Sequence, residues 1–192
     1  MQSRRVCTIL EKHATPVLFQ TMGKPSMSST VSEALRLTMR LWSCGVTVVT
    51  SSDGEERTGM TASSFTSIAL EPPLVLVCLH KAAPTTALIE RTGVMGISIL
   101  SVDQEHLSSQ FAGFTELPEG ADKFYQVNTF TDETGSPLLS DAIAWMDCKV
   151  FGVQDGATHL IIVGEVLKTG RKDDPVQPLV YHNRAYRQFR MD

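Results

Sequence analysis

Small hydroxyl side chains crowd one short stretch of the chain, beside an apolar run. They are Thr61, Ser63, Ser64, Thr66 and Ser67. Small side chains let a backbone approach a flat polar ligand closely, and the hydroxyls and amides can then hydrogen-bond carbonyl, sugar or phosphate oxygens. The same residues are also typical of a Ser/Thr-rich edge strand and loop. On composition, both interpretations stay open.

Three further residues could contribute a charge, a hydroxyl or a titratable ring. Lys81 and Thr85 follow the apolar run at 74–79 and flank Pro84, which predicts a helix start. A hydroxyl and backbone amides at a helix N-terminus favour an anion, although a surface lysine is commonly just solvated. His159 opens a later apolar run, where a single histidine is more often structural than functional.

The cysteines argue against a metal site. They are Cys7, Cys44, Cys78 and Cys148, with no C-x-x-C pair and no histidine at ligand spacing. Without a secretory signal, reduced thiols in a cytoplasmic setting are the better interpretation than disulfides. We therefore expect no metal.

The elements that position these residues are mainly strands. Strands are predicted at 46–50, 57–63, 74–79, 94–100, 144–154, 158–169 and 179–182. Asp53-Gly54 predicts a hairpin turn between the first two strands. The continuous apolar run at 74–79 predicts a strand buried on both faces or inside a barrel.

Three short helices are predicted between the strands. The first helix is predicted at 31–43; it begins with a capping box formed by Thr30 and Glu33 and is ended by Gly45. The second is predicted at 84–91, and the third begins with Asp103 as its cap and runs to 112. Residues 113–137 are predicted to form a long loop, a length usually associated with function. The fold class is therefore mainly β, a barrel with a few rim helices, because regular βα alternation is absent.

Several motifs, in order and at matching spacing, are similar to those of the short-chain flavin reductase family. They are Gly45-Val-Thr-Val-Val-Thr50, Gly59-Met-Thr-Ala-Ser-Ser-Phe-Thr-Ser67, Pro72-Pro-Leu-Val-Leu-Val-Cys78, Thr158-His-Leu-Ile-Ile-Val-Gly-Glu-Val166 and Tyr181-His-Asn-Arg-Ala-Tyr-Arg187. The resemblance covers about residues 31–188. It implies a homodimeric FMN-binding split barrel, of the kind that serves as reductase component of two-component monooxygenases.

The resemblance also implies site residues. Flavin would be bound by Thr47, Thr61, Ala62, Ser63, Ser64, Phe65, Thr66, Lys81, Thr85, Phe111, Gly113, Lys123, Arg184 and Tyr186. Lys81 and Thr85 would hold the phosphate, and His159 would contact the nicotinamide side. Phe111 can also be interpreted as a residue on the buried side of its helix, without contact to the flavin.

Three departures from the family pattern bear on function. Ala82 and Ala83 replace common serines near the phosphate, Thr158 replaces an aspartate before His159, and Ser43-Cys44 replaces Pro-Thr. Weaker phosphate binding would suit an exchangeable flavin. The missing aspartate removes a carboxylate that could orient the His159 ring toward a nicotinamide.

The function implied is reduction of FMN, with FAD possible, by NADH or NADPH for a partner monooxygenase. The protein's part would be to stack the two rings and to favour developing negative charge through backbone amides. The alternatives are FMN as a fixed prosthetic group acting on an organic substrate, and a non-catalytic flavin- or haem-binding protein.

Charge and hydropathy set the remaining expectations. The net charge of −4 gives no basic surface for nucleic acid, and no apolar run is long enough to cross a membrane. Residues 1–30 carry four basic groups and one acidic group, and are expected to be a disordered or organelle-targeting extension. Residues 31–192 are expected to form the split-barrel domain.

Overall fold

The computed structural model describes residues 29–173 and 176–189. The chain divides into two compact units, Met1–Leu37 and Thr38–Asp192. Most of helix α1 (Ser29–Met39) belongs to the first unit, and all of the strands belong to the second. The expected extension at 1–30 lies almost wholly outside the described residues.

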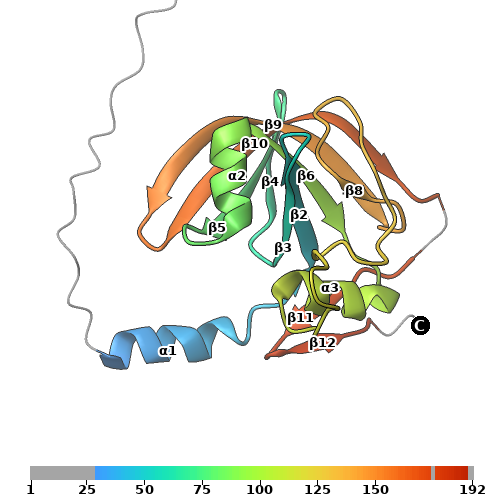
Figure 1. Ribbon diagram of the computed structural model, residues 1–192. Helices are drawn as coiled ribbons and strands as arrows, with labels where there is room; N and C mark the ends of the chain where they lie inside the picture. Colours follow the sequence, from blue (N-terminus) through green and yellow to red (C-terminus); the bar gives the residue numbers. More distant parts are fainter. Residues whose placement is uncertain (1–28, 174–175, 190–192) are drawn as a thin grey trace, which may run out of the picture. The chain divides into compact units, whose positions relative to one another are not determined.

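The second unit is built on one seven-stranded sheet in which every pairing is antiparallel (Figure 1). Its order is β3-β2-β6-β9-β10-β5-β4. The strands are β2 (Thr47–Ser52), β3 (Arg57–Ala62), β4 (Thr66–Leu70), β5 (Pro73–His80), β6 (Val94–Ile99), β9 (Ala144–Gly156) and β10 (His159–Arg171). The sheet curls, so that its edge strand β3 contacts β5. The expected mainly β architecture is confirmed.

Strand β5 shows how the sheet is packed. Val75, Val77 and Leu79 are buried, whereas the residues between them are only half-buried. Of the two predicted alternatives for this strand, burial on both faces is wrong and a place in the barrel is confirmed. One face packs into a core with Ile97 and Ile162, and the other is covered less completely. Alternate residues of a strand point to opposite faces, so an apolar sequence need not bury both.

Helices α2 (Pro84–Thr92) and α3 (Glu105–Ala112) end as the sequence predicts. Gly93 and Gly113 adopt left-handed conformations with φ of 70° and 81° and donate backbone N–H groups to the preceding turn. The start of α3 differs: a short 3-10 turn, Val102–Gln104, precedes it, and Ser101 rather than Asp103 caps that turn. The Ser101 N–H donates to Gln104 Oε1 at 2.9 Å, which leaves Asp103 inside the turn.

Helix α1 also differs from its prediction. It includes Thr30 and stops at Met39, four residues before the predicted end, because Leu41 and Trp42 form tighter turns with Thr38 and Met39. The chain then becomes extended in β1 (Cys44–Gly45), so Gly45 does not end the helix.

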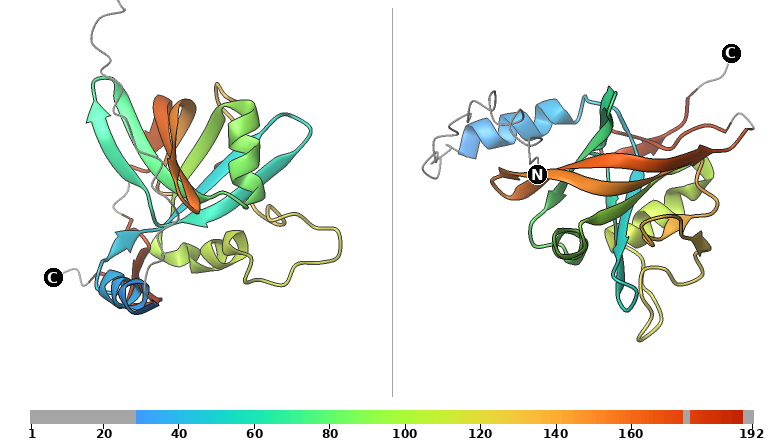
Figure 2. Two further views of the ribbon diagram at one scale, coloured as in Figure 1. Left: turned by 90° about the vertical axis from the view of Figure 1, so that its left-hand side faces the viewer. Right: turned by 90° about the horizontal axis from the view of Figure 1, so that it is seen from above.

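Two small sheets complete the unit (Figure 2). Strand β1 pairs with β11 (Val180–His182), which pairs with β12 (Ala185–Arg187); β7 (Thr129–Phe130) pairs with β8 (Leu138–Leu139). Apart from β7, residues 113–137 are irregular, as expected. Over the described part of the chain, no helix combines the length and apolar character that a membrane span requires.

Candidate functional site

The predicted site residues fall into three neighbourhoods. One is the connection between β3 and β4, a second surrounds α3, and the third lies where β5 and β10 pair, near α2. The first and third are joined through β5, and the first and second through β3.

Ser64 closes the curled sheet. Its hydroxyl donates to the Cys78 carbonyl at 2.7 Å and accepts from the Cys78 N–H at 3.1 Å. The backbone pairing of β4 with β5 stops at Thr66 and Leu76. Beyond that point, the Ser64 hydroxyl replaces the backbone as the hydrogen-bonding partner of β5. The Ser64 hydroxyl, which was predicted to face the flavin, therefore fixes the loop between β3 and β4 to β5.

Thr47 and Ala62 support the same loop from inside. Thr47 is 2% exposed, and its Oγ1 donates to the Ala62 carbonyl at 2.8 Å. Ala62 is buried in the core, and Phe65 packs against that core. These residues position the loop through packing, and their contact with a flavin stays a prediction.

Ser63 and Thr66 present the exposed hydroxyls of this loop. Both residues are exposed. Thr66 donates to the Ser67 carbonyl over a long 3.4 Å, and Ser63 Oγ has no partner among the residues that the structure describes. Of the predicted hydroxyls here, these two are the ones available to a ligand.

Around α3, two predicted residues meet at one that sequence reasoning missed. The Thr61 hydroxyl donates to the Ser108 carbonyl at 2.6 Å, and the Tyr186 hydroxyl donates to Ser108 Oγ at 2.8 Å. Ser108 is fully buried. Its position on the inward face of a predicted helix was the available signal, since a buried serine needs polar partners.

Phe111 and Lys123 form the rest of this neighbourhood. Phe111 is fully buried and packs edge-on against Phe124, with ring centroids 5.0 Å apart, so its side chain belongs to the core. Lys123 Nζ donates to the Phe111 carbonyl at 2.7 Å, and burial lowers the pKa of this lysine. Gly113 supplies the left-handed turn between them.

Glycine is required at one point of this packing. A Cβ on Gly59 would lie 2.7 Å from Phe111 Cε1. Real Cβ atoms essentially never come that close, so the first residue of the Gly59–Ser67 motif is a packing position.

Arg184 lies in the turn between β11 and β12. Asn183 and Arg184 have φ of 50° and 63°, the left-handed pair typical of a tight hairpin. The Arg184 side chain is exposed, while Tyr186 is half-buried with its ring 5.5 Å from that of Tyr181.

His159 meets His80 where β10 and β5 pair. The two residues are directly opposite each other in the ladder, and their rings pack edge to face with centroids 5.1 Å apart. His159 Nδ1 lies 2.9 Å from Thr158 Oγ1, and His80 Nδ1 accepts the Ala82 N–H at 3.1 Å. The threonine that replaces the usual aspartate thus still holds the His159 ring. Sequence reasoning missed His80.

Lys81, the residue after the end of β5, is in an ion pair. Its Nζ lies 2.8 Å from Asp155 Oδ1. The nearby helix α2 begins with Ala83 as its cap residue, which provides no side-chain acceptor, and Pro84 follows. Thr85 is 2% exposed. Pro84 has no N–H and the Thr86 and Ala87 N–H groups donate to the Ala83 carbonyl, so the candidate phosphate donors here are the Thr85 N–H and the Lys81 ammonium group.

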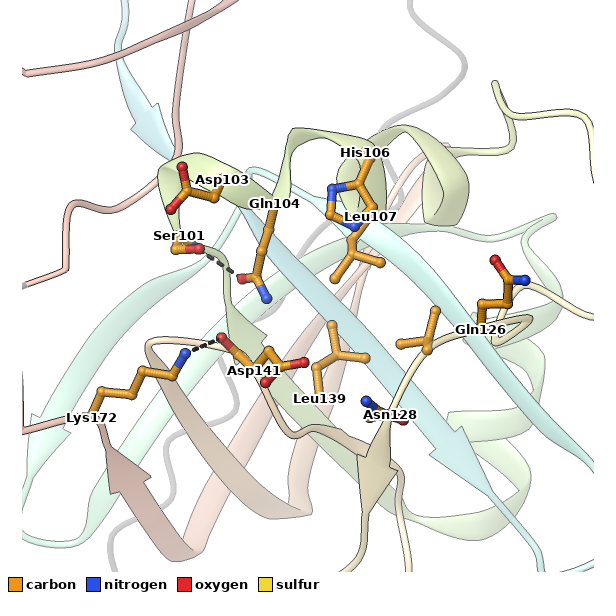
Figure 3. Close-up of a pocket in the computed structure, with 11 residues that line it drawn as sticks. Ser101, Asp103, Gln104, His106, Leu107, Gln126, Asn128, Leu139, Asp141 and Lys172 are labelled. Carbon is orange, nitrogen blue, oxygen red and sulfur yellow. Dashed lines mark hydrogen bonds between the residues drawn. The ribbon is translucent and has the colours of Figure 1, made fainter.

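Two cavities in the described part of the second unit bear on the site. One, of about 380 Å³, lies between the start of α3 and residues 126–128 and 139–141 (Figure 3). The other, of about 570 Å³, is mainly apolar and runs along β4, β5 and β10. Phe65 lines the second; no other predicted site residue lines either one.

Neither metal chemistry nor disulfide chemistry is suggested by the described part of the chain. Residues 29–173 and 176–189 contain no group of three or more His, Cys, Asp or Glu side chains that could hold a metal ion. Cys44, Cys78 and Cys148 are free thiols.

Comparison with known proteins supplies the functional context. Residues 39–190 match the family model described as a flavin reductase like domain. An NADH-dependent FAD reductase of Streptomyces globisporus is 36% identical over 149 residues, covering 77% of this chain and 80% of that protein. An NADH-dependent flavin reductase of a Rhodococcus species is 35% identical over 160 residues, covering 82% and 86%.

Solved structures agree with these relatives. The Streptomyces globisporus NADH:FAD oxidoreductase SgcE6 superimposes with a TM-score of 0.77 at 33% identity, over 85% of this chain and 96% of that one. The flavin reductase PheA2 does so with a TM-score of 0.74 at 31% identity, over 83% and 98%. The expected flavin reductase split barrel is confirmed.

Proposed function

The chain belongs to the flavin reductase like domain family, and we propose from this premise that it reduces FMN with NADH and releases the reduced flavin to a flavin-dependent monooxygenase. It is an oxidoreductase of the flavin reductase kind. The observation that carries the proposal is the match over 39–190, which spans all three neighbourhoods of predicted site residues.

The donors on the chain suit a flavin phosphate. Lys81 comes shortly before α2, where Ala83 supplies no side-chain cap. Pro84 has no N–H, and the Thr86 and Ala87 N–H groups donate to the Ala83 carbonyl, so Thr85 carries the N–H of this first turn that is left for an anion. An anion there is favoured by both the ammonium group and the helix dipole. The relatives include enzymes named as FAD and as FMN reductases. We favour FMN because its monoester phosphate fits this terminal position.

The remaining residues would orient the two rings. A bound flavin supplies a ring that accepts hydride from the nicotinamide. Ser63, the exposed backbone around it and Thr66 would donate hydrogen bonds to the oxygens of that ring. His159, held by Thr158 and His80, would contact the nicotinamide from the opposite strand. No residue of the chain needs to move a proton for the hydride step, so positioning is the protein's contribution.

A homodimer and a cytoplasmic location are part of the proposal. Edge strand β4 exposes Ile68 by 48% and Leu70 by 85%, and the β9–β10 hairpin exposes Phe151 by 62%. An apolar sheet edge needs cover, and a second copy would supply it. Light scattering tests the dimer. The free thiols support a reducing compartment.

Anaerobic titration with NADH tests the catalytic proposal. Purified protein with added FMN should lose flavin absorbance on addition of NADH, and aerobic NADH oxidation should saturate as free FMN is raised. NADPH in parallel determines nicotinamide preference. A protein that binds FMN but oxidises neither nicotinamide would exclude reductase activity and favour a binding protein. Turnover that is independent of added flavin would favour a fixed prosthetic group.

A further inference from the structure

We propose that Asp155 weakens the binding of the flavin phosphate by occupying Lys81, and thereby keeps FMN exchangeable. This inference rests on the proposed function, since it takes Lys81 as a phosphate ligand. Asp155 lies outside every motif that the sequence analysis identified.

Both partners of the ion pair are held in place by the same turn. The Lys81 N–H donates to the Thr158 carbonyl at 3.0 Å. Asp155 Oδ1 accepts from Lys81 Nζ at 2.8 Å and from the Ala157 N–H at 2.8 Å. Ala157 has φ of 68°, which turns its N–H back toward the carboxylate. The carboxylate is therefore fixed beside the ammonium group by the β9–β10 turn itself.

The carboxylate is ionised at neutral pH. The side-chain hydrogen bond from Lys81, followed by the backbone hydrogen bond from Ala157, holds the pKa of Asp155 below its ordinary value. A phosphate arriving at Lys81 thus meets an ammonium group that is already paired. The phosphate is also repelled by the Asp155 carboxylate, which is hydrogen-bonded to the same ammonium group.

Competition of this kind affects only the charged end of the ligand. A phosphate monoester carries a charge of about −1.5 to −2 at pH 7. Riboflavin has the same ring and ribityl chain without the phosphate. Asp155 should therefore lower the affinity for FMN and leave the affinity for riboflavin unchanged, which separates this role from a general structural one.

Asp155→Asn is the matched substitution. Asparagine keeps an Oδ1 acceptor for the Ala157 N–H and removes the charge. Coulomb's law in water, for a unit charge about 6 Å from a doubly charged phosphate, corresponds to roughly a tenfold change in affinity before screening by salt. We expect D155N to bind FMN about three- to tenfold more tightly at low ionic strength.

The measurement is equilibrium titration with FMN and with riboflavin, without NADH, followed by flavin fluorescence or calorimetry. Glu133→Gln is the control for net charge, since Glu133 forms an exposed ion pair with Lys168 elsewhere on the protein. Lys81→Gln completes a double-mutant cycle: the gain from D155N should be smaller in its presence, because the carboxylate still repels the phosphate but no ammonium group remains to be released.

The outcomes are separable from those of the proposed function. FMN affinity unchanged in D155N, riboflavin affinity raised equally, an equal gain in Glu133→Gln, or a full gain in the Lys81→Gln background would each overturn the inference. Because binding is measured without NADH, a protein that shows the D155N effect but oxidises no NADH would contradict the proposed activity and support the role of Asp155.

Discussion

Ser64→Ala tests whether the loop between β3 and β4 is held by a side chain. Ser64 makes two hydrogen bonds with the backbone of Cys78, as donor at 2.7 Å and as acceptor at 3.1 Å. A hydrogen bond contributes about 0.5–1.5 kcal/mol to stability. Removing both should lower the free energy of unfolding by about 1–3 kcal/mol. For a chain of this size that corresponds to a fall in Tm of about 3–9 °C.

The neighbouring Ser63→Ala is the matched control. Ser63 is exposed, and its hydroxyl has no partner within the described residues, so its removal should change the unfolding free energy by less than about 0.5 kcal/mol. Thermal and guanidinium unfolding without flavin measures both variants. FMN titration should show the complementary pattern, with S63A weakening binding while Tm is unchanged. The reasoning is refuted if S64A is as stable as S63A.

Three other substitutions or reagents probe the same unit. Gly59→Ala would place a Cβ 2.7 Å from Phe111 Cε1 and should cost about 1–3 kcal/mol by overpacking; an unchanged Tm would contradict this. His159→Gln should raise KM for NADH several-fold with an unchanged Kd for FMN, and equal loss of both affinities would point to a structural role instead. Burial, and then the Asp147 charge, raises the pKa of the Cys148 thiol to about 12. A thiol reagent at pH 8 should therefore label half-buried Cys44 and leave Cys148 unmodified in native protein, as peptide mass spectrometry would show.

Local patterns predicted most of the strands and helices because their signals are short-range. The glycines after α2 and α3 end those helices by adopting positive φ, a property that the residue type alone provides. The start of α3 was predicted wrongly although its signal is also local. Ser101 and Gln104 form a capping box, in which the Gln104 side chain folds back to the Ser101 N–H, and this pattern was overlooked in favour of Asp103.

The candidate site was predictable in outline and less so in the roles of individual residues. The residues that motif order selected fall into three neighbourhoods of the fold, and their contact with a flavin stays a prediction. Motif order could not show that Phe111 is a core residue, or that His80 lies opposite His159, because the register between β5 and β10 sets that pairing. The pairing of Lys81 with Asp155 depends on the same register and on the shape of a turn 74 positions away.

The hydroxyl cluster divides by the direction of its hydrogen bonds. The hydroxyls of Thr47, Thr61 and Ser64 each donate their single proton to a protein carbonyl. Toward a ligand they can therefore act only as acceptors. Flavin carbonyl and phosphate oxygens require donors, which Ser63 and backbone N–H groups would supply, together with Thr66 and Lys81 once these leave the Ser67 carbonyl and Asp155. Of the five hydroxyls at 61–67, those of Thr61 and Ser64 therefore support the fold, and the exposed ones are left to bind an oxygen-rich flavin.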